Sequence, residues 1–182
     1  MLGFVQVIKL KYFMGNGIIY LWVFFGRVFQ NPDICRIKNR KMATAEKVVV
    51  NTRWLNNMSF ESEANGHKIL LDASVEGGGE DLGPRPKTLM LTALGGCTGM
   101  DVASILKKMR VDFKSLNVIV EGIQTEEHPR HYYKLHVIYE IEGENLPMDK
   151  LKKAVLLSEE RYCGVSVVYR QAMEMTSEIR II

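Results

Sequence analysis

The chain has 182 residues, of which 47% are hydrophobic and 25% charged, and its formal net charge is only +3. This size suits one ordinary domain with an appendage, and the weak charge makes nucleic acid an unexpected partner. The three cysteines, Cys35, Cys97 and Cys163, are too few and too widely spaced for a disulfide scaffold or a zinc cluster, so no metal site is predicted. They fit a reducing, cytoplasmic compartment and one or two reactive thiols.

Residues 1–41 form an extension that contains an apolar, aromatic run at residues 17–25, with Lys and Arg on both sides. The run is shorter than the roughly 20 residues that a spanning helix needs, and no small-residue cleavage site follows it. Three interpretations remain open: a membrane-surface anchor, a poorly ordered extension, or upstream sequence before a true start at Met42. We favour the third, because globular patterning begins there, and we predict one domain over residues 42–182, for which a membrane is not an expected partner.

Three short strands are predicted at the beginning of this domain. The Asn65-Gly66 pair is typical of a two-residue hairpin turn between antiparallel strands. A glycine-rich loop at residues 77–83 then leads onward, and it is either a flexible gate beside a site or a plain linker. We expect the strands at residues 47–54, 58–63 and 67–73, in an antiparallel meander.

A long central helix is predicted within residues 84–110, because apolar residues recur there at helical spacing and basic residues follow in the last turn. Its middle is unusual, since Gly95 and Gly96 precede Cys97 and Gly99 follows. Each glycine costs about 1 kcal/mol relative to alanine in a helix interior. The small residues either keep the Cys97 sulfur uncrowded and allow another element to approach, or they mark a tight crossing with a buried cysteine.

The rest of the chain alternates again between strand and helix patterns. Pro147 suits the first turn of a second amphipathic helix, which ends in a break and a short third helix around Cys163. The predicted strands lie at residues 116–121, 133–141 and 173–181. The order of elements indicates an α+β fold with helices packed against an antiparallel sheet.

The two helices that carry or precede Cys97 and Cys163 must bury their apolar sides against the same sheet, so the two sulfurs are expected to lie near one another. Such a pair can react with a peroxide, one thiolate forming a sulfenic acid and the other resolving it as a disulfide. Asp101 follows Cys97 by one helical turn. Because a nearby carboxylate disfavours a thiolate, we expect Asp101 to point elsewhere or to be paired.

Several segments together closely resemble the OsmC/Ohr family of osmotically inducible and organic hydroperoxide resistance proteins, and the likeness extends over residues 47–182. The Ala-x-Gly-Gly-Cys form is closest to a less characterised OsmC-like branch. The segments are Pro84-x-Pro86, Leu89-Met90-Leu91-x-Ala93-Leu94-Gly95-Gly96-Cys97, Asp101-Val102-x-Ser104-Ile105-Leu106 and Ser158-x-Glu160-x-Tyr162-Cys163-x-Val165-Ser166.

The resemblance implies an intertwined homodimer in which sheets from both chains cover the central helices, with active sites at the subunit interface. It also implies that Cys97 is the peroxidatic thiol and Cys163 the resolving thiol. Small organic hydroperoxides would be reduced to alcohols without a bound cofactor, and an external dithiol, such as a lipoyl group, would regenerate the enzyme. Two alternatives remain: a ligand-binding or redox-sensing protein, and a thiol enzyme that acts on a non-peroxide electrophile.

The chain departs from the family at the residues that activate the thiolate. Well-studied members carry a glutamate shortly after the second proline, where this chain has Lys87, and an arginine in the first hairpin loop, where it has Leu55-Asn56-Asn57. Arg53, Arg85 and Lys87 are therefore the candidate cations near Cys97. We expect Lys87 in particular to lower the pKa of the Cys97 thiol.

Overall fold

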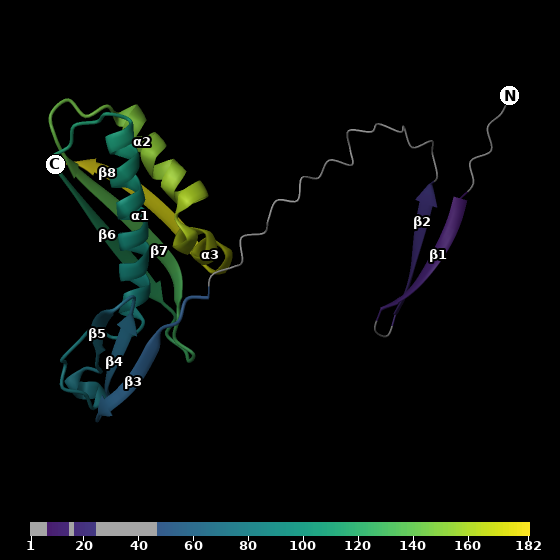
Figure 1. Cartoon of the computed structure of the whole chain (residues 1–182), viewed down its shortest axis with the longest axis horizontal. Helices are drawn as coiled ribbons and strands as arrows, with labels where there is room; N and C mark the ends of the chain where they lie inside the picture. Colours follow the sequence, from purple (N-terminus) through teal and green to yellow (C-terminus); the bar gives the residue numbers. More distant parts are fainter. Residues whose placement is uncertain (1–6, 15–16, 25–46) are drawn as a thin grey trace. The chain divides into compact units, whose positions relative to one another are not determined.

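A computed structural model describes residues 7–14, 17–24 and 47–182, which belong to two compact units, Met1–Val48 and Val49–Ile182. In the first unit, β1 (Val7–Met14) and β2 (Gly17–Phe24) pair as antiparallel strands (Figure 1). The apolar run of the extension is thus mainly a β-strand. The proposed start at Met42 and the third cysteine, Cys35, lie outside the described residues.

The second unit begins with a three-stranded antiparallel sheet in the order β3–β4–β5, as predicted. Asn65 and Gly66 both have positive φ, 52° and 78°, as a two-residue hairpin turn requires. The first strand of this sheet, β3, starts at residue 51, so the prediction of strand at residues 47–50 is wrong. The bounds are β3 Asn51–Asn56, β4 Ser59–Ala64 and β5 His67–Leu71.

The glycine-rich loop after β5 is anchored to this first sheet. A short 3-10 helix, η2 (Val75–Gly77), begins the loop, and Gly83 packs so closely that an added Cβ would lie 2.3 Å from the carbonyl oxygen of Leu70. These contacts favour a structured linker over a flexible gate. The buried Asp72 carboxylate accepts hydrogen bonds, which lower its pKa, from the backbone N–H groups of Leu82, Glu80 and Ala73, at 3.1, 3.0 and 2.8 Å.

The second sheet has the order β6–β7–β8, and the helices pack against it (Figure 1). The predicted α+β architecture is confirmed, with one difference: β8 pairs with β7 in parallel. The chain returns from β7 through two helices and a π-helical turn, η3, and such a crossover lets the next strand run in the same direction. The bounds are α1 Thr88–Lys108, β6 Ser115–Gln124, β7 Tyr132–Glu142, α2 Met148–Leu157, η3 Ser158–Tyr162, α3 Gly164–Ala172 and β8 Glu174–Ile181.

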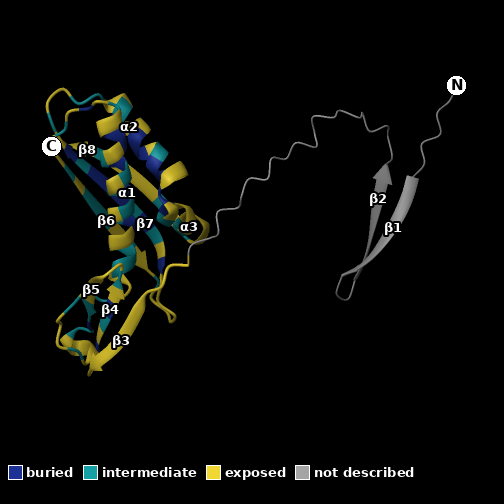
Figure 2. Ribbon diagram, in the orientation of Figure 1, coloured by how far each residue is buried: buried dark blue, intermediate teal, exposed yellow. Residues whose placement is uncertain are grey.

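The core lies between α1, α2 and the β6–β7–β8 sheet (Figure 2). Length and apolar composition alone would allow α1 to cross a membrane, a property that core helices of soluble proteins share. The fully buried positions include Leu94 and Leu106 on α1, Leu135, Tyr139 and Ile141 on β7, and Leu151 on α2.

Two of the three glycines of α1 bring the helix close to β6. A Cβ added to Gly95 would lie 3.3 Å from Val120, and one added to Gly99 would lie 3.2 Å from Val118. The expected close approach is therefore confirmed for Gly95 and Gly99. Gly96 has no atom within 4 Å of that position, so its missing side chain serves no contact among the described residues.

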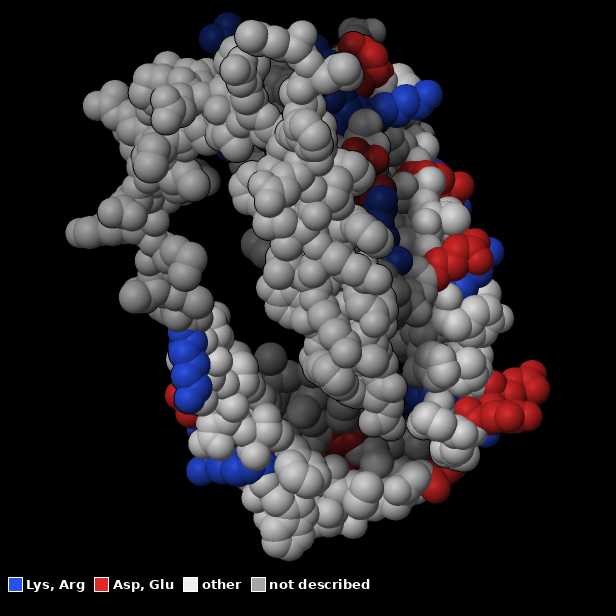
Figure 3. Space-filling view, turned by 90° about the vertical axis from the view of Figure 1, so that its right-hand side faces the viewer, with Lys and Arg blue, Asp and Glu red and all other residues white. Residues whose placement is uncertain are grey.

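Charges of both signs occur together on the surface of the described residues. Figure 3 shows Lys and Arg interspersed with Asp and Glu along the right-hand margin of the molecule. Several form exposed pairs, such as Lys134 with Glu174 at 3.0 Å. Exposed pairs of this kind contribute little to stability, typically about 0–1 kcal/mol, so the fold depends mainly on its apolar core.

Candidate functional site

The fold brings Cys97, Asp101 and Cys163 together. Cys97 and Asp101 lie one turn apart on the same side of α1, and Cys163 lies at the junction of η3 and α3. The two sulfurs and a carboxylate oxygen lie within 4.8 Å of one another. Cys97 is half-buried, whereas Cys163 is completely buried. The predicted proximity of the two thiols is therefore confirmed, and it depends on the packing of α3 beside the middle of α1.

The beginning of α3 directs backbone donors at both sulfurs. Cys163 is the N-cap residue of α3, and its Sγ accepts a hydrogen bond from the N–H of Ser166 at 3.4 Å. The N–H of Val165 donates to the side chain of Cys97 and acts to lower its pKa. Because the N-terminal end of a helix carries a partial positive charge, the Val165 N–H favours negative charge on the Cys97 sulfur.

The surroundings nevertheless raise the pKa of the Cys97 thiol above its ordinary value. Burial makes the largest contribution, and the neighbouring Cys163 raises it further through a hydrogen bond and through charge. The negative charge of Asp101 adds to the rise, while the Val165 N–H opposes it. None of these main contributions, within residues 47–182, comes from a cation. In a single chain Cys97 is thus mostly a protonated thiol at neutral pH.

The three candidate cations have other partners in the structure. Arg53 pairs with Glu61 at 2.7 Å, and Arg85 pairs with Asp81. Lys87 donates to a side-chain oxygen of Gln124 at 2.7 Å. Lys87 also precedes Cys97 by ten helical positions, and a rise of about 1.5 Å per residue separates them by about 15 Å along the axis. The prediction that Lys87 lowers the pKa of Cys97 is therefore wrong within one chain.

Asp101 does not point away from the thiols, and it is paired, which is the second of the two arrangements that we expected. One carboxylate oxygen, Oδ2, accepts a hydrogen bond from the hydroxyl of Ser158 at 3.2 Å. The carboxylate is thus paired, but with a neutral group, and its charge still acts on Cys97. Helical geometry explains why Asp101 lies near Cys97, because residues four apart share one face of a helix.

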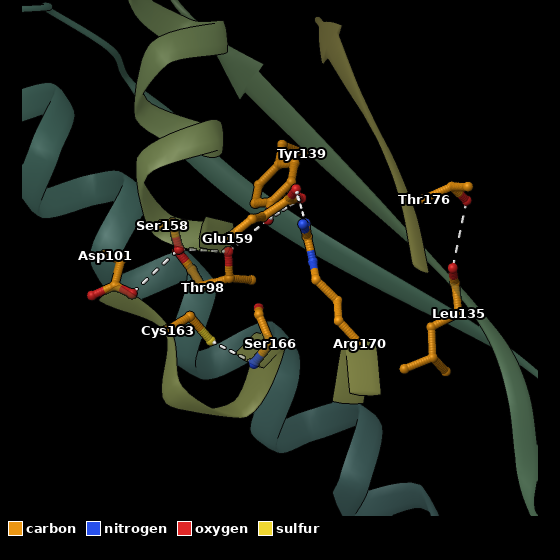
Figure 4. A network of polar contacts seen from close by, with 10 residues as sticks. All are labelled: Thr98, Asp101, Leu135, Tyr139, Ser158, Glu159, Cys163, Ser166, Arg170 and Thr176. Atoms are coloured by element: carbon orange, nitrogen blue, oxygen red, sulfur yellow. Dashed lines mark hydrogen bonds and ion pairs between the residues drawn. The ribbon is translucent and has the colours of Figure 1, made fainter. Parts of the chain in front are cut away.

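Behind the thiols, a buried chain of hydrogen bonds connects Asp101 to Arg170 (Figure 4). Thr98 Oγ1 lies 2.9 Å from Ser158 Oγ and 2.6 Å from Tyr139 Oη. Tyr139 donates to Glu159 at 3.3 Å, and Arg170 pairs with the same carboxylate at 2.6 Å. This hydrogen-bond network was not predicted from the sequence. Polar side chains at positions predicted to be buried could have indicated it, because buried polar groups require hydrogen-bond partners.

Three hydroxyl groups link the carboxylates of Asp101 and Glu159, and they have fewer protons than the hydrogen-bond contacts that they make. These hydroxyls, those of Ser158, Thr98 and Tyr139, offer three protons to four contacts. Burial raises the pKa of Tyr139, so this hydroxyl keeps its proton. Tyr139 is therefore a neutral hydroxyl that links Thr98 to the carboxylate of Glu159.

Comparison with known proteins identifies the family. The model of the family described as OsmC-like protein matches residues 77–178. Protein YhfA of Escherichia coli K12 is 33% identical over 131 residues, which cover 71% of this chain and 95% of YhfA. The chain therefore belongs to the OsmC-like family.

Solved structures share the same fold. A hypothetical protein from Aquifex aeolicus is 27% identical, with a TM-score of 0.65 over 75% of this chain and 98% of that one. The organic hydroperoxide resistance protein OhrB of Bacillus subtilis is 16% identical, with a TM-score of 0.52 over 74% of this chain and 98% of OhrB. At that identity, OhrB supports the fold alone.

Proposed function

We propose that this OsmC-like protein is a thiol-dependent peroxidase that reduces organic hydroperoxides, with Cys97 as the peroxidatic thiol and Cys163 as the resolving thiol. One observation carries the proposal: a half-buried thiol and a fully buried thiol, from distant parts of the chain, lie within 4.8 Å of each other. A substrate can reach the first, while the second is protected from solvent and positioned to react with the product.

The reaction uses the two sulfurs in sequence. The Cys97 thiolate attacks the terminal oxygen of the hydroperoxide, the O–O bond breaks, and the alcohol leaves after taking up a proton. Cys163 then attacks the sulfur of the resulting sulfenic acid, forming the disulfide and releasing water. An external dithiol, such as a lipoyl group, supplies the two electrons that restore both thiols. No bound cofactor takes part.

We further propose that the protein acts as a homodimer in a reducing compartment. The first sheet and its β3–β4 turn expose large apolar side chains, including Trp54, Phe60 and Met58, and α1 exposes Met100 beside Gly96. Exposed apolar groups of this extent are typical of a surface that another chain covers. A second copy would also offer its own Arg53, Arg85 or Lys87 to lower the pKa of Cys97.

The test is to add one equivalent of an organic hydroperoxide to the reduced protein, count free thiols, and locate any disulfide by mass spectrometry. We expect a Cys97–Cys163 disulfide that the Cys97→Ser variant cannot form. The Cys163→Ser variant should stop at a sulfenic acid that a dimedone probe traps, and Cys35→Ser should react normally. Survival of both thiols in the parent protein would refute the peroxidase proposal.

One observation favours a second function, the binding of an apolar ligand. A pocket of about 640 Å³ lies between the first sheet and residues 85–87, just before α1, and apolar side chains such as Met58, Phe60 and Leu71 form much of its wall. The raised pKa of Cys97 also disfavours fast thiolate chemistry in one chain. If this function holds, the thiols will survive the hydroperoxide, and an apolar fluorescent probe will bind saturably and more weakly to Phe60→Ser.

A further inference from the structure

We propose that Cys97, Asp101 and Cys163 form a binding site for one thiophilic divalent cation, of which Zn²⁺ is the representative. The site contains two sulfurs and a carboxylate oxygen, all within 4.8 Å of one another. Thiolate and carboxylate are established ligands of Zn²⁺, and thiolates select against hard cations such as Mg²⁺ and Ca²⁺. The proposal does not depend on peroxide reduction.

The dimensions of the cluster suit this ion. Bonds from Zn²⁺ of about 2.3 Å to sulfur and about 2.1 Å to oxygen, in tetrahedral geometry, separate the ligand atoms by about 3.6–3.8 Å. The atoms observed within 4.8 Å of one another need only small side-chain rotations to reach that spacing. The backbone is fixed, because Cys97 and Asp101 lie in the middle of α1 and Cys163 caps α3.

The surrounding groups match the outer shell of a metal site. Ser158 holds one oxygen of Asp101, which leaves the other oxygen for an ion. The N–H groups of Val165 and Ser166 donate to the two sulfurs and would stabilise both as thiolates. Outer-shell hydrogen bonds of this kind orient ligands and tune affinity. The hydroxyl of Ser166 is also buried without a partner among the described residues.

An ion has a route to the cluster. Cys97 is half-buried, and Asp101 lines a pocket of about 320 Å³ together with Ser104, Lys108 and Tyr162. With three protein ligands, a tetrahedral ion would take a water molecule as its fourth ligand. The wide spacing of the cysteines in the sequence argued against a zinc cluster. The fold removes that objection for Cys97 and Cys163.

Metal binding and disulfide formation exclude each other at this site. A disulfide forms when the two thiols lose two protons and two electrons, and it leaves no thiolate to bind the ion. Diamide, a thiol oxidant, takes up both electrons and both protons as it becomes the hydrazine. Oxidation by diamide should therefore release the metal without any hydroperoxide, so failure of the peroxidase proposal would not affect this result.

The experiment uses the full chain in a Cys35→Ser background, reduced and treated with a chelator that is then removed. Co²⁺ serves as the spectroscopic probe, and Zn²⁺ competition reports affinity. We expect one ion per chain, a thiolate-to-cobalt charge-transfer band, and loss of that band with diamide. Asp101→Asn should weaken Zn²⁺ binding at least about tenfold, since even outer-shell losses cost about 10–100-fold. Asp149→Asn, at an exposed position of α2, is the matched control and should bind normally.

Circular dichroism of each variant shows whether it folds, and Asp101→Cys gives a second test because it offers a sulfur in place of the oxygen. Retained binding in Asp101→Cys, with weakened binding in Asp101→Asn, would support a ligand role. Absence of the charge-transfer band in the parent protein would overturn the proposal. Equal affinity of the parent and Asp101→Asn would equally overturn the three-ligand site.

Discussion

The two three-stranded sheets of the second unit differ in how far one chain covers them. The central strand β7 buries Leu135, Val137 and Tyr139 almost completely beneath the helices. In contrast, every residue of β3 is exposed, and Trp54 keeps 64% of its surface accessible. One face of the β6–β7–β8 sheet is thus covered by helices of the same chain. The first sheet, in contrast, keeps apolar side chains exposed to solvent unless another surface covers them. The thiol pair lies with the core of the β6–β7–β8 sheet.

The largest expected effect on stability comes from truncating a core side chain of the β6–β7–β8 sheet. Leu135→Ala should lower the free energy of unfolding by about 2–5 kcal/mol, because it leaves a cavity under α1. Ile69→Ala, on the first sheet and 37% exposed, should cost clearly less. Urea unfolding of both variants measures the difference. Equal losses would mean that another chain covers the first sheet in solution.

A smaller effect is expected where the loop after β5 meets the first sheet. Gly83→Ala should destabilise the protein by about 1–3 kcal/mol, because the new methyl group would press on the carbonyl oxygen of Leu70. Gly96→Ala is the control, and in a monomer it should be neutral or stabilising by up to about 1 kcal/mol. Thermal unfolding compares them. A destabilised Gly96→Ala variant would indicate a partner packed against that face of α1.

Removing one hydroxyl from the buried hydrogen-bond chain should have a lesser effect. Tyr139→Phe breaks the link between Thr98 and Glu159 and should cost about 0.5–1.5 kcal/mol. Tyr132→Phe, also on β7, is the control because no side-chain hydrogen bond of Tyr132 occurs within residues 47–182. Chemical unfolding should separate the two. If the two variants are equally stable, the hydrogen bonds of Tyr139 contribute nothing to the free energy of unfolding.

The smallest expected change is in the pH dependence of the Cys97 thiol. Its pKa is raised, first by burial and then by Cys163 and Asp101, so the thiolate fraction is low at neutral pH and grows as pH rises. Alkylation by iodoacetamide, with a chelator present, should accelerate up to pH values above the ordinary thiol range. Asp101→Asn should shift this profile to lower pH, because it removes a negative charge.

A different result would sharpen the comparison of the two sheets. If Cys97 alkylates at a constant, high rate near neutral pH, a cation outside the single chain must lower its pKa. Repeating the measurement on Arg53→Gln, Arg85→Gln and Lys87→Gln would then identify which residue of a second copy reaches the thiol.

Much of the fold was predictable from local patterns. The Asn65-Gly66 turn and the alternation along β7 each specify a structure through backbone preference or burial on one face. The parallel pairing of β8 was not predictable in this way, because alternation defines the faces of a strand but not its neighbour.

The site was predictable in part. The two cysteines and their proximity follow from sequence, but the position of α3, which presents its first N–H groups to both sulfurs, depends on tertiary packing. The proximity of Asp101 to Cys97 could be predicted from helical spacing alone. The link through Tyr139 to Arg170 joins residues of three elements, and no local pattern encodes it.

The position of Cys163 in the crossover between β7 and β8 has a consequence during synthesis. Cys97 leaves the ribosome 66 residues before Cys163, the difference between positions 163 and 97. At about 5–20 residues per second, Cys97 spends about 3–13 s in the nascent chain before Cys163 has been translated. During that interval Cys97 has neither Cys163 nor the helix α3 beside it. Small thiols and oxidants of the cell therefore meet Cys97 before its pairing with Cys163 is possible.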